Sequence, residues 1–156
     1  MRKANREVQD KQELKSILEK CDVCRIAFMD NDFPYIVPMS FGFEFEEKLV
    51  LFFHCAMEGR KLEIMKQNNN VCFEMDCSHE LKVGEAACNY SMNYESIIGT
   101  GKIELVQNEQ YKILALNQIM QHYGRTDNLE YNKEVLERTA ILKIVAEHFA
   151  GKKLNK

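Results

Sequence analysis

The residues whose types and spacing could do chemistry gather in one stretch of the 156-residue chain, FFHCAMEGRKLEIM. An apolar run ends at His54 and Cys55, and Gly59, Arg60 and Lys61 follow just before a helical pattern. An imidazole, a thiol, a glycine and two cations at this spacing fit a metal site, a nucleophile with its base, or a binding site for an anion. Each of these implies a different protein.

The glycine and the two cations favour the anion site. Gly59 allows the chain to turn tightly where a helix over residues 60–67 is predicted to begin. The N–H groups in the first turn of a helix lack partners and carry partial positive charge, so they attract phosphate. Arg60 adds a planar fork of donors and Lys61 a compact charge, and without an anion both would be unfavourable beside the helix dipole. The alternative is two solvated cations on a surface helix.

The other two chemistries find less support. Adjacent residues on a strand point to opposite faces, so His54 and Cys55 do not easily form a base and nucleophile pair, and only one of them faces the core or a cavity. The alternative for His54 is a hydrogen-bonded structural residue. Cys21 and Cys24 have the spacing of half a zinc site, but no second pair of this kind follows, so we predict no metal.

Composition excludes several classes of protein. A chain of 156 residues with 46% hydrophobic residues and a net charge of -3 is expected to form one folded domain without a nucleic-acid partner. No apolar run approaches the roughly 20 residues needed to span a bilayer, so no membrane partner is expected. The charged N-terminus is not followed by an apolar signal region, which predicts a cytoplasmic protein whose six cysteines are thiols.

Hydrophobic periodicity predicts the elements that position these residues. Helices are expected over residues 11–20, 60–67 and 108–123. Strands are expected over residues 23–30, 33–46, 48–53, 71–76, 94–106 and 138–153. Pro34 and Pro38 push their segment to a sheet edge or bulge, because proline cannot donate to a ladder. Residues 77–94 are expected to form a loop with a possible short strand. Gly99 and Gly101 share one strand face, which indicates a close neighbour or a bend.

Strands outnumber helices in this order, and most strand connections are short. The pattern predicts a mainly β (α+β) fold, an antiparallel barrel with helices laid against it.

Three stretches in this order, FPYIVPMSF, FHCAMEGRK and YESIIGTG, resemble the flavin-binding split barrels related to pyridoxamine 5'-phosphate oxidase. The chain resembles most closely their 5-nitroimidazole-resistance (Nim) branch, and the resemblance covers nearly its whole length. It implies a six-stranded antiparallel split β-barrel with flanking helices, a single FMN-binding domain over residues 1–156. It also implies a homodimer with the cofactor at the subunit interface. FAD and haem are the alternative cofactors that the resemblance allows.

The resemblance also assigns roles to individual residues. Lys61 and Arg60 would hold the FMN phosphate, and Ser96 would lie on a strand facing the flavin. His54 would lie near the reacting centre and act as a proton donor, since histidine titrates near neutral pH. The residues that would lie along the isoalloxazine ring, with their backbone groups bonded to it, are Pro38, Met39, Ser40 and Phe41.

The function expected from the resemblance is that of an FMN-dependent oxidoreductase. It would transfer two electrons to a nitro compound such as a 5-nitroimidazole, or to a related small acceptor. The alternatives are a flavin- or haem-binding protein without significant turnover, and a dimeric split barrel with an inactive site.

Overall fold

The computed structural model describes residues 4–127 and 129–155, so residues 1–3, 128 and 156 of the expected domain lie outside the described part. The helical elements, in chain order, are η1 (Ala4–Arg6), α1 (Lys11–Lys20), α2 (Arg60–Gln67), η2 (Ala87–Asn89), α3 (Glu109–His122) and α4 (Lys133–Glu137). The strands are β1 (Glu7–Val8), β2 (Cys24–Asp30), β3 (Phe33–Met39), β4 (Phe41–Phe45), β5 (Leu49–Ala56), β6 (Asn70–Lys82), β7 (Ser91–Leu105) and β8 (Thr139–Leu154). None of the described helices is long and apolar enough to cross a membrane.

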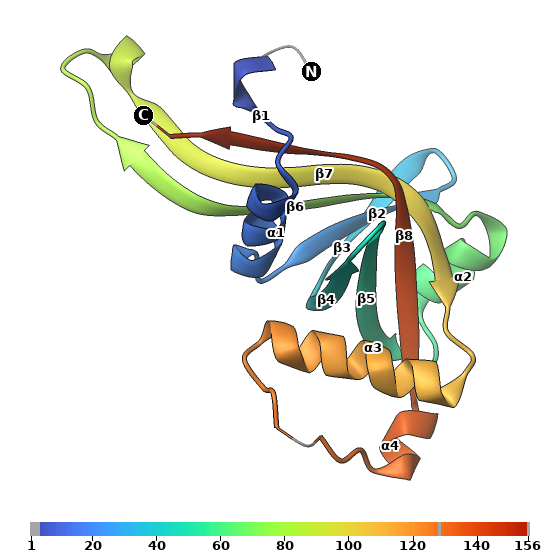
Figure 1. Cartoon of the computed structure of the whole chain (residues 1–156). Coiled ribbons are helices and arrows are strands. Elements are labelled where there is room, and N and C mark those ends of the chain that lie inside the picture. Colours follow the sequence, from blue (N-terminus) through green and yellow to red (C-terminus); the bar gives the residue numbers. More distant parts are fainter. Residues whose placement is uncertain (1–3, 128, 156) are drawn as a thin grey trace.

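The strands form one antiparallel sheet in the order β3-β2-β6-β7-β8-β5-β4, with β1 paired to β8. Although β3 and β4 lie at opposite ends of this order, only Ser40 separates them in the chain. The sheet must therefore curl until its two edges meet at Ser40 (Figure 1). This arrangement confirms the predicted mainly β split barrel with flanking helices, joined at one point and open along the rest of its edges.

Over the residues that the structure describes, the sheet has eight strands where six were predicted. The expected strand over residues 33–46 is two strands, because the chain bends at Ser40 and pairs with β2 before the bend and with β5 after it. The other addition is β1, which has only two residues and carries too little periodicity to be recognised. The prediction that the two prolines lie on an edge strand is correct, since β3 ends the strand order.

The loop predicted over residues 77–94 is wrong. Most of this segment continues β6 and β7 as a long hairpin, which we call the arm, and it projects beyond the barrel (Figure 1). The register shifts between Cys77 and Glu80, and Ser78 has a positive φ of 57°. This bulge interrupts the alternation of polar and apolar residues, which is why the sequence pattern concealed the strand.

Two of the helices pack against the sheet, each at a different place. The apolar face of α1 packs against β6 and β7, and α3 packs against β4 and β5. Asp10 caps α1 by accepting a hydrogen bond from the Glu13 N–H at 2.8 Å, so this helix has the predicted bounds. The closeness suggested by Gly99 is also confirmed. A Cβ at this position would lie 2.3 Å from the ring of Phe73, so only glycine allows that ring to pack against β7.

Candidate functional site

The predicted phosphate-binding residues lie at a corner where the start of α2 meets the ends of β2 and β3. Arg60 donates to the Asp30 carboxylate through Nε at 2.8 Å and through Nη2 at 2.6 Å. Its guanidinium also lies 4.6 Å from the centre of the Tyr35 ring. Asp30 and Tyr35 were missed as site residues, since an acidic turn residue and a strand tyrosine carry no local signal. Together they fix Arg60 at this corner.

Lys61 differs from its neighbour in its contacts. Within the described part of the chain, Lys61 forms no hydrogen bond or ion pair. It lies close to Cys55, where burial raises the pKa of the thiol and the lysine charge partly opposes that rise. The helix start beside it is uncapped, because Gly59 has no side chain, and its φ of 137° is unfavourable for other residues. An anion at this corner would therefore meet an unpaired ammonium and uncapped N–H groups.

The open edge of β3 runs from this corner towards Ser40. Pro34 and Pro38 have no N–H to donate, so we infer that they and Ile36 turn their backbone groups away from β2, towards the open edge. Ile36 then offers one N–H and one C=O there, and the prolines offer carbonyls. A flat heterocycle with donors and acceptors on its rim can bond to such an edge as a further strand does.

The four residues predicted to lie along a flavin ring differ in burial. The side chains of Met39 and Phe41 are buried in the core, whereas those of Pro38 and Ser40 are exposed. The backbone amide of Phe41 already has a partner, because it donates to the Tyr123 hydroxyl at 3.2 Å. A ring at this edge can therefore use the backbone around Pro38 and Ser40, while the Phe41 amide helps to hold the bend.

The structure does not bring His54 or Ser96 to the corner. His54 shares its face of β5 with Phe52, which packs with α3, whereas Cys55 packs against the barrel core. His54 is exposed and forms no hydrogen bond with any described residue. Ser96 pairs with Asp76 near the arm, roughly 17 Å along β7 from the level of the corner.

A shallow groove lies beside the corner on the outer face of the sheet. Its volume is about 290 Å³. Met29, which precedes Asp30, and its cross-strand partner Pro34 belong to its lining, as do Cys72 and Thr100 further across. The lining is mostly apolar, so the groove can take a flat apolar body next to the cations of the corner.

A larger hollow of about 380 Å³ lies between α1 and α3. Its histidine, His122, is held 2.7 Å from the carbonyl of Cys21 and packs 4.4 Å from the Phe41 ring. Because that imidazole already connects α3 to the end of α1, we assign it a structural role. The corner and its neighbouring groove remain the better candidate site.

Comparison with known proteins agrees with this architecture. The sequence model of the pyridoxamine 5'-phosphate oxidase family matches residues 10–153. A crystal structure of a candidate 5-nitroimidazole antibiotic resistance protein from Bacteroides thetaiotaomicron is 34% identical, with a TM-score of 0.81, over 94% of this chain and 86% of that one. No curated protein matches by sequence.

More distant structures share the fold. The flavocytochrome Anf3 from Azotobacter vinelandii is 19% identical with a TM-score of 0.80, over 100% of this chain and 72% of that one. A protein from Mycobacterium smegmatis that binds FAD and haem is 17% identical with a TM-score of 0.84, over 97% of this chain and 74% of that one. The match of the family model over nearly the whole chain, together with the 34% identical relative, decides the family. This chain belongs to the pyridoxamine 5'-phosphate oxidase family of split-barrel proteins.

Proposed function

We propose that this protein is an FMN-dependent oxidoreductase that reduces nitro compounds such as 5-nitroimidazoles, or a related small acceptor. The observation that carries the proposal is the corner itself, where Lys61, which pairs with no described residue, and the uncapped start of α2 lie next to the open edge of β3. The 34% identical relative, named for 5-nitroimidazole resistance, supports the choice of substrate class. When bound, FMN supplies transfer of a hydride, or of two electrons, to the acceptor.

The residues of the chain fit FMN at its two ends. Lys61 and the first-turn N–H groups of α2 bind the phosphate. Arg60, which is hydrogen-bonded to Asp30, adds a second positive charge beside it. The β3 edge from Ile36 to Ser40 orients the ring through backbone groups. Within one subunit His54 lies on the face of β5 that packs with α3, so its role as proton donor requires the acceptor to enter from that side.

The outer face of the sheet is the surface through which we propose that two copies associate. The chain exposes 9974 Å². A folded monomer of its mass exposes about 8,100 Å², so the excess is roughly 1,800 Å². A standard interface buries about 800 Å² on each partner. The excess is therefore sufficient for a dimer.

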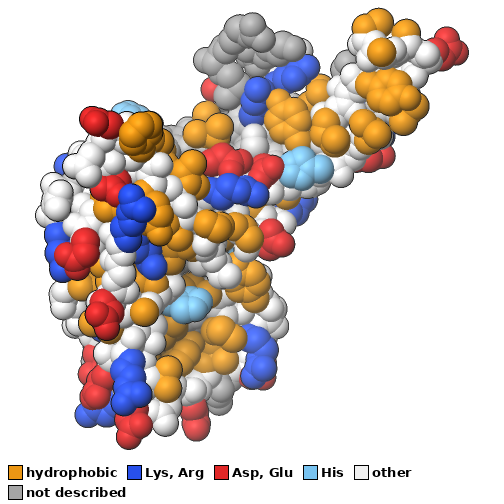
Figure 2. All heavy atoms as spheres, turned by 180° about the vertical axis from the view of Figure 1, so that it is seen from behind, with side chains coloured by type: hydrophobic (Ala, Val, Ile, Leu, Met, Phe, Trp, Pro, Cys, Tyr) orange, Lys and Arg blue, Asp and Glu red, His pale blue; other side chains and the backbone are white. Residues whose placement is uncertain are grey.

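Apolar side chains mark where that interface lies. Met29, Ile36 and Ile98 share the outer face, and Met92 and Leu81 continue it onto the arm, all between 43% and 59% exposed. Figure 2 shows hydrophobic side chains on the projecting arm. Ser96 lies on the same face of β7 as Ile98, so a second copy that covers this face would bring Ser96 close to the partner's cofactor.

The alternative is a flavin- or haem-binding protein without significant turnover. The observation that favours it is His54, since an exposed imidazole without a hydrogen-bond partner in the described structure is also a potential haem ligand. Two relatives of the same fold are named as a flavocytochrome and as an FAD- and haem-binding protein.

One experiment separates these functions. The purified protein is titrated with FMN, FAD, riboflavin and haem while visible absorption is followed, and the flavin-loaded form is reduced and mixed with a 5-nitroimidazole. Tighter binding of FMN than of riboflavin, followed by reoxidation of the flavin by the nitro compound without oxygen, supports the proposal. Flavin or haem binding with no reoxidation selects the alternative. Equal affinity for FMN and riboflavin contradicts the phosphate site.

A further inference from the structure

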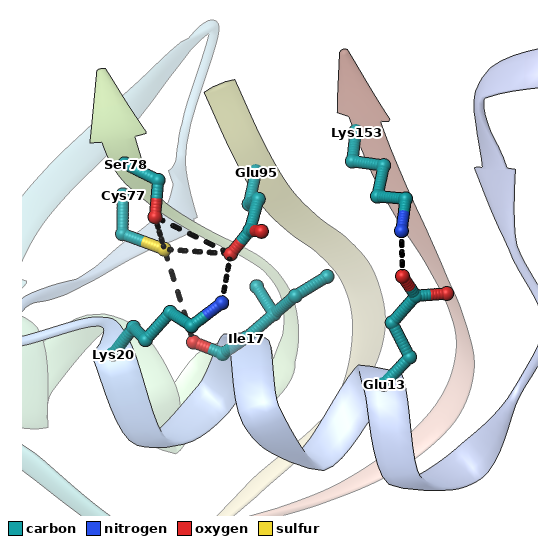
Figure 3. Close-up of polar contacts among 7 residues, drawn as sticks. All are labelled: Glu13, Ile17, Lys20, Cys77, Ser78, Glu95 and Lys153. Carbon is teal, nitrogen blue, oxygen red and sulfur yellow. Dashed lines mark hydrogen bonds and ion pairs between the residues drawn. The ribbon is translucent and has the colours of Figure 1, made fainter. Parts of the chain in front are cut away.

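Two cysteines meet where the end of α1 touches β6. Cys21 follows the last turn of α1, and its N–H donates to the carbonyl of Ile17 at 3.2 Å. The Cys77 thiol lies 4.0 Å from the same carbonyl (Figure 3). The side chains of Cys77 and Cys21 also interact directly with each other. Cys77 packs against the barrel core, on the face of β6 opposite to the proposed dimer interface. The pair is therefore separate from the cofactor corner.

Polar groups that can take part in proton transfer surround the Cys77 thiol. The thiol lies 3.8 Å from the Glu95 carboxylate, which can accept that proton. Ser78 lies with its hydroxyl 3.6 Å from the sulfur and 3.3 Å from Glu95, so after deprotonation it can donate to the sulfur. Lys20 bonds the same carboxylate at 2.7 Å and places a positive charge beside the cluster (Figure 3). Cys77 is also half-buried, which leaves it within reach of a small reagent.

Cys21, unlike Cys77, is shielded from reagents in solution. It is 1% exposed. Burial raises its pKa, and the neighbouring Cys77 raises it further, so Cys21 stays a protonated thiol. A buried thiol of this kind is inert towards reagents in solution. It can attack only an electrophile generated beside it, which fixes the order in which the two sulfurs react.

We propose that Cys77 and Cys21 form a thiol pair that reacts with hydroperoxides and closes to a disulfide. Cys77 loses its proton to Glu95, and its sulfur attacks the peroxide. The O–O bond breaks, and the released alkoxide, or hydroxide when the reagent is hydrogen peroxide, takes up the proton held by Glu95 and leaves as an alcohol or as water. Cys77 becomes a sulfenic acid. The sulfur of Cys21 then displaces the hydroxyl of the sulfenic acid, which leaves as water with the proton of Cys21. The two thiols supply the two electrons that reduce one peroxide.

The experiment uses the reduced full-length protein and hydrogen peroxide. Remaining thiols are alkylated after treatment, the protein is digested without reduction, and cross-linked peptides are identified by mass spectrometry. The expected product joins Cys21 to Cys77, and in Cys21→Ala a sulfenic-acid trap labels Cys77 instead. Cys72→Ser, which removes an exposed thiol, leaves the Cys21–Cys77 product unchanged. Absence of this product in the wild-type protein, or labelling of Cys77 no faster than of the exposed Cys88, overturns the proposal.

A rate measurement separates reaction at a prepared site from simple proximity. Glu95→Gln removes the proton acceptor and should slow oxidation of Cys77 roughly tenfold. Glu104→Gln is the matched control, since Glu104 is a β7 carboxylate that also pairs with a lysine, Lys143, away from the thiols. Equal rates in both variants would show that Glu95 does not prepare Cys77 and would overturn the proposal. The measurement is made without flavin, so it does not depend on the proposed oxidoreductase activity.

Discussion

Asp30 accepts two hydrogen bonds from the guanidinium of Arg60, at 2.8 Å from Nε and 2.6 Å from Nη2. Because of this contact, the two adjacent cations at the start of α2 differ in whether they already have a partner. Arg60 is bound within the protein and stacked 4.6 Å from the centre of the Tyr35 ring, whereas Lys61 pairs with no described residue. Lys61 is therefore the cation that an incoming anion meets first.

Lys61→Ala should weaken FMN binding more than tenfold. A charge-assisted hydrogen bond to phosphate contributes about 1.5–3 kcal/mol, and each 1.4 kcal/mol is about tenfold in the dissociation constant. Titration followed by flavin absorption measures the effect. Lys66→Ala is the matched control, because Lys66 lies in the last turn of the same helix and pairs with Glu63. If riboflavin binding weakens as much as FMN binding, Lys61 does not contact the phosphate.

Asp30→Asn should tighten FMN binding a few-fold. The substitution removes the negative charge that holds Arg60 and repels phosphate at the same corner, and the freed guanidinium can turn to the phosphate. The loss of folding stability should stay below about 1 kcal/mol, since Arg60 is largely exposed. The same titration, combined with urea unfolding, checks both values. Weaker FMN binding by Asp30→Asn would show that Arg60 binds phosphate only in the position that Asp30 gives it.

Ile98→Glu should convert the proposed dimer to a monomer. A carboxylate at the centre of the outer face would be buried without a partner on association, and the two-fold symmetry of a dimer would introduce it twice. Light scattering after size-exclusion chromatography should give a mass near that of the 18.3 kDa chain instead of about twice that value. Val135→Glu, which changes a similarly exposed residue on α4, should leave the mass of the assembly unchanged.

Folding stability should fall in alkaline solution because of Cys24. Burial raises the pKa of this thiol from 9.0 to about 12. Above pH 9 the unfolded chain therefore binds fewer protons than the folded chain, so the free energy of unfolding falls as pH rises between about 9 and 12. Below pH 9 the contribution is fully present. The slope should be about 1 kcal/mol per pH unit for this thiol.

Urea unfolding at pH 8, 9 and 10 measures that slope. Cys24→Ala should make it shallower, whereas Cys72→Ser, at an exposed position, should not. An unchanged slope in Cys24→Ala would mean that burial of this thiol does not couple folding to pH.

Local sequence determined much of this protein. The bounds of α1 and α2 and the N-cap of α3 follow from capping residues and apolar spacing, which act within a few residues. The order of three short stretches was enough to indicate the family, and the family model and the 34% identical relative confirm it. Gly59 and the two cations that follow it predicted an anion site at the start of α2, and that site stays a prediction.

The tertiary structure decided what depends on distant parts of the chain. The arm was not predicted, because its bulge at Ser78 interrupts the alternation from which strands are recognised. The different contacts of Arg60 and Lys61 follow from Asp30, which is far away in the sequence and is brought to α2 only when β2 enters the sheet. The Cys21–Cys77 pair arises in the same way. Local spacing fixes helices and strands, whereas the partners of a side chain are fixed only when the strands assemble into the sheet.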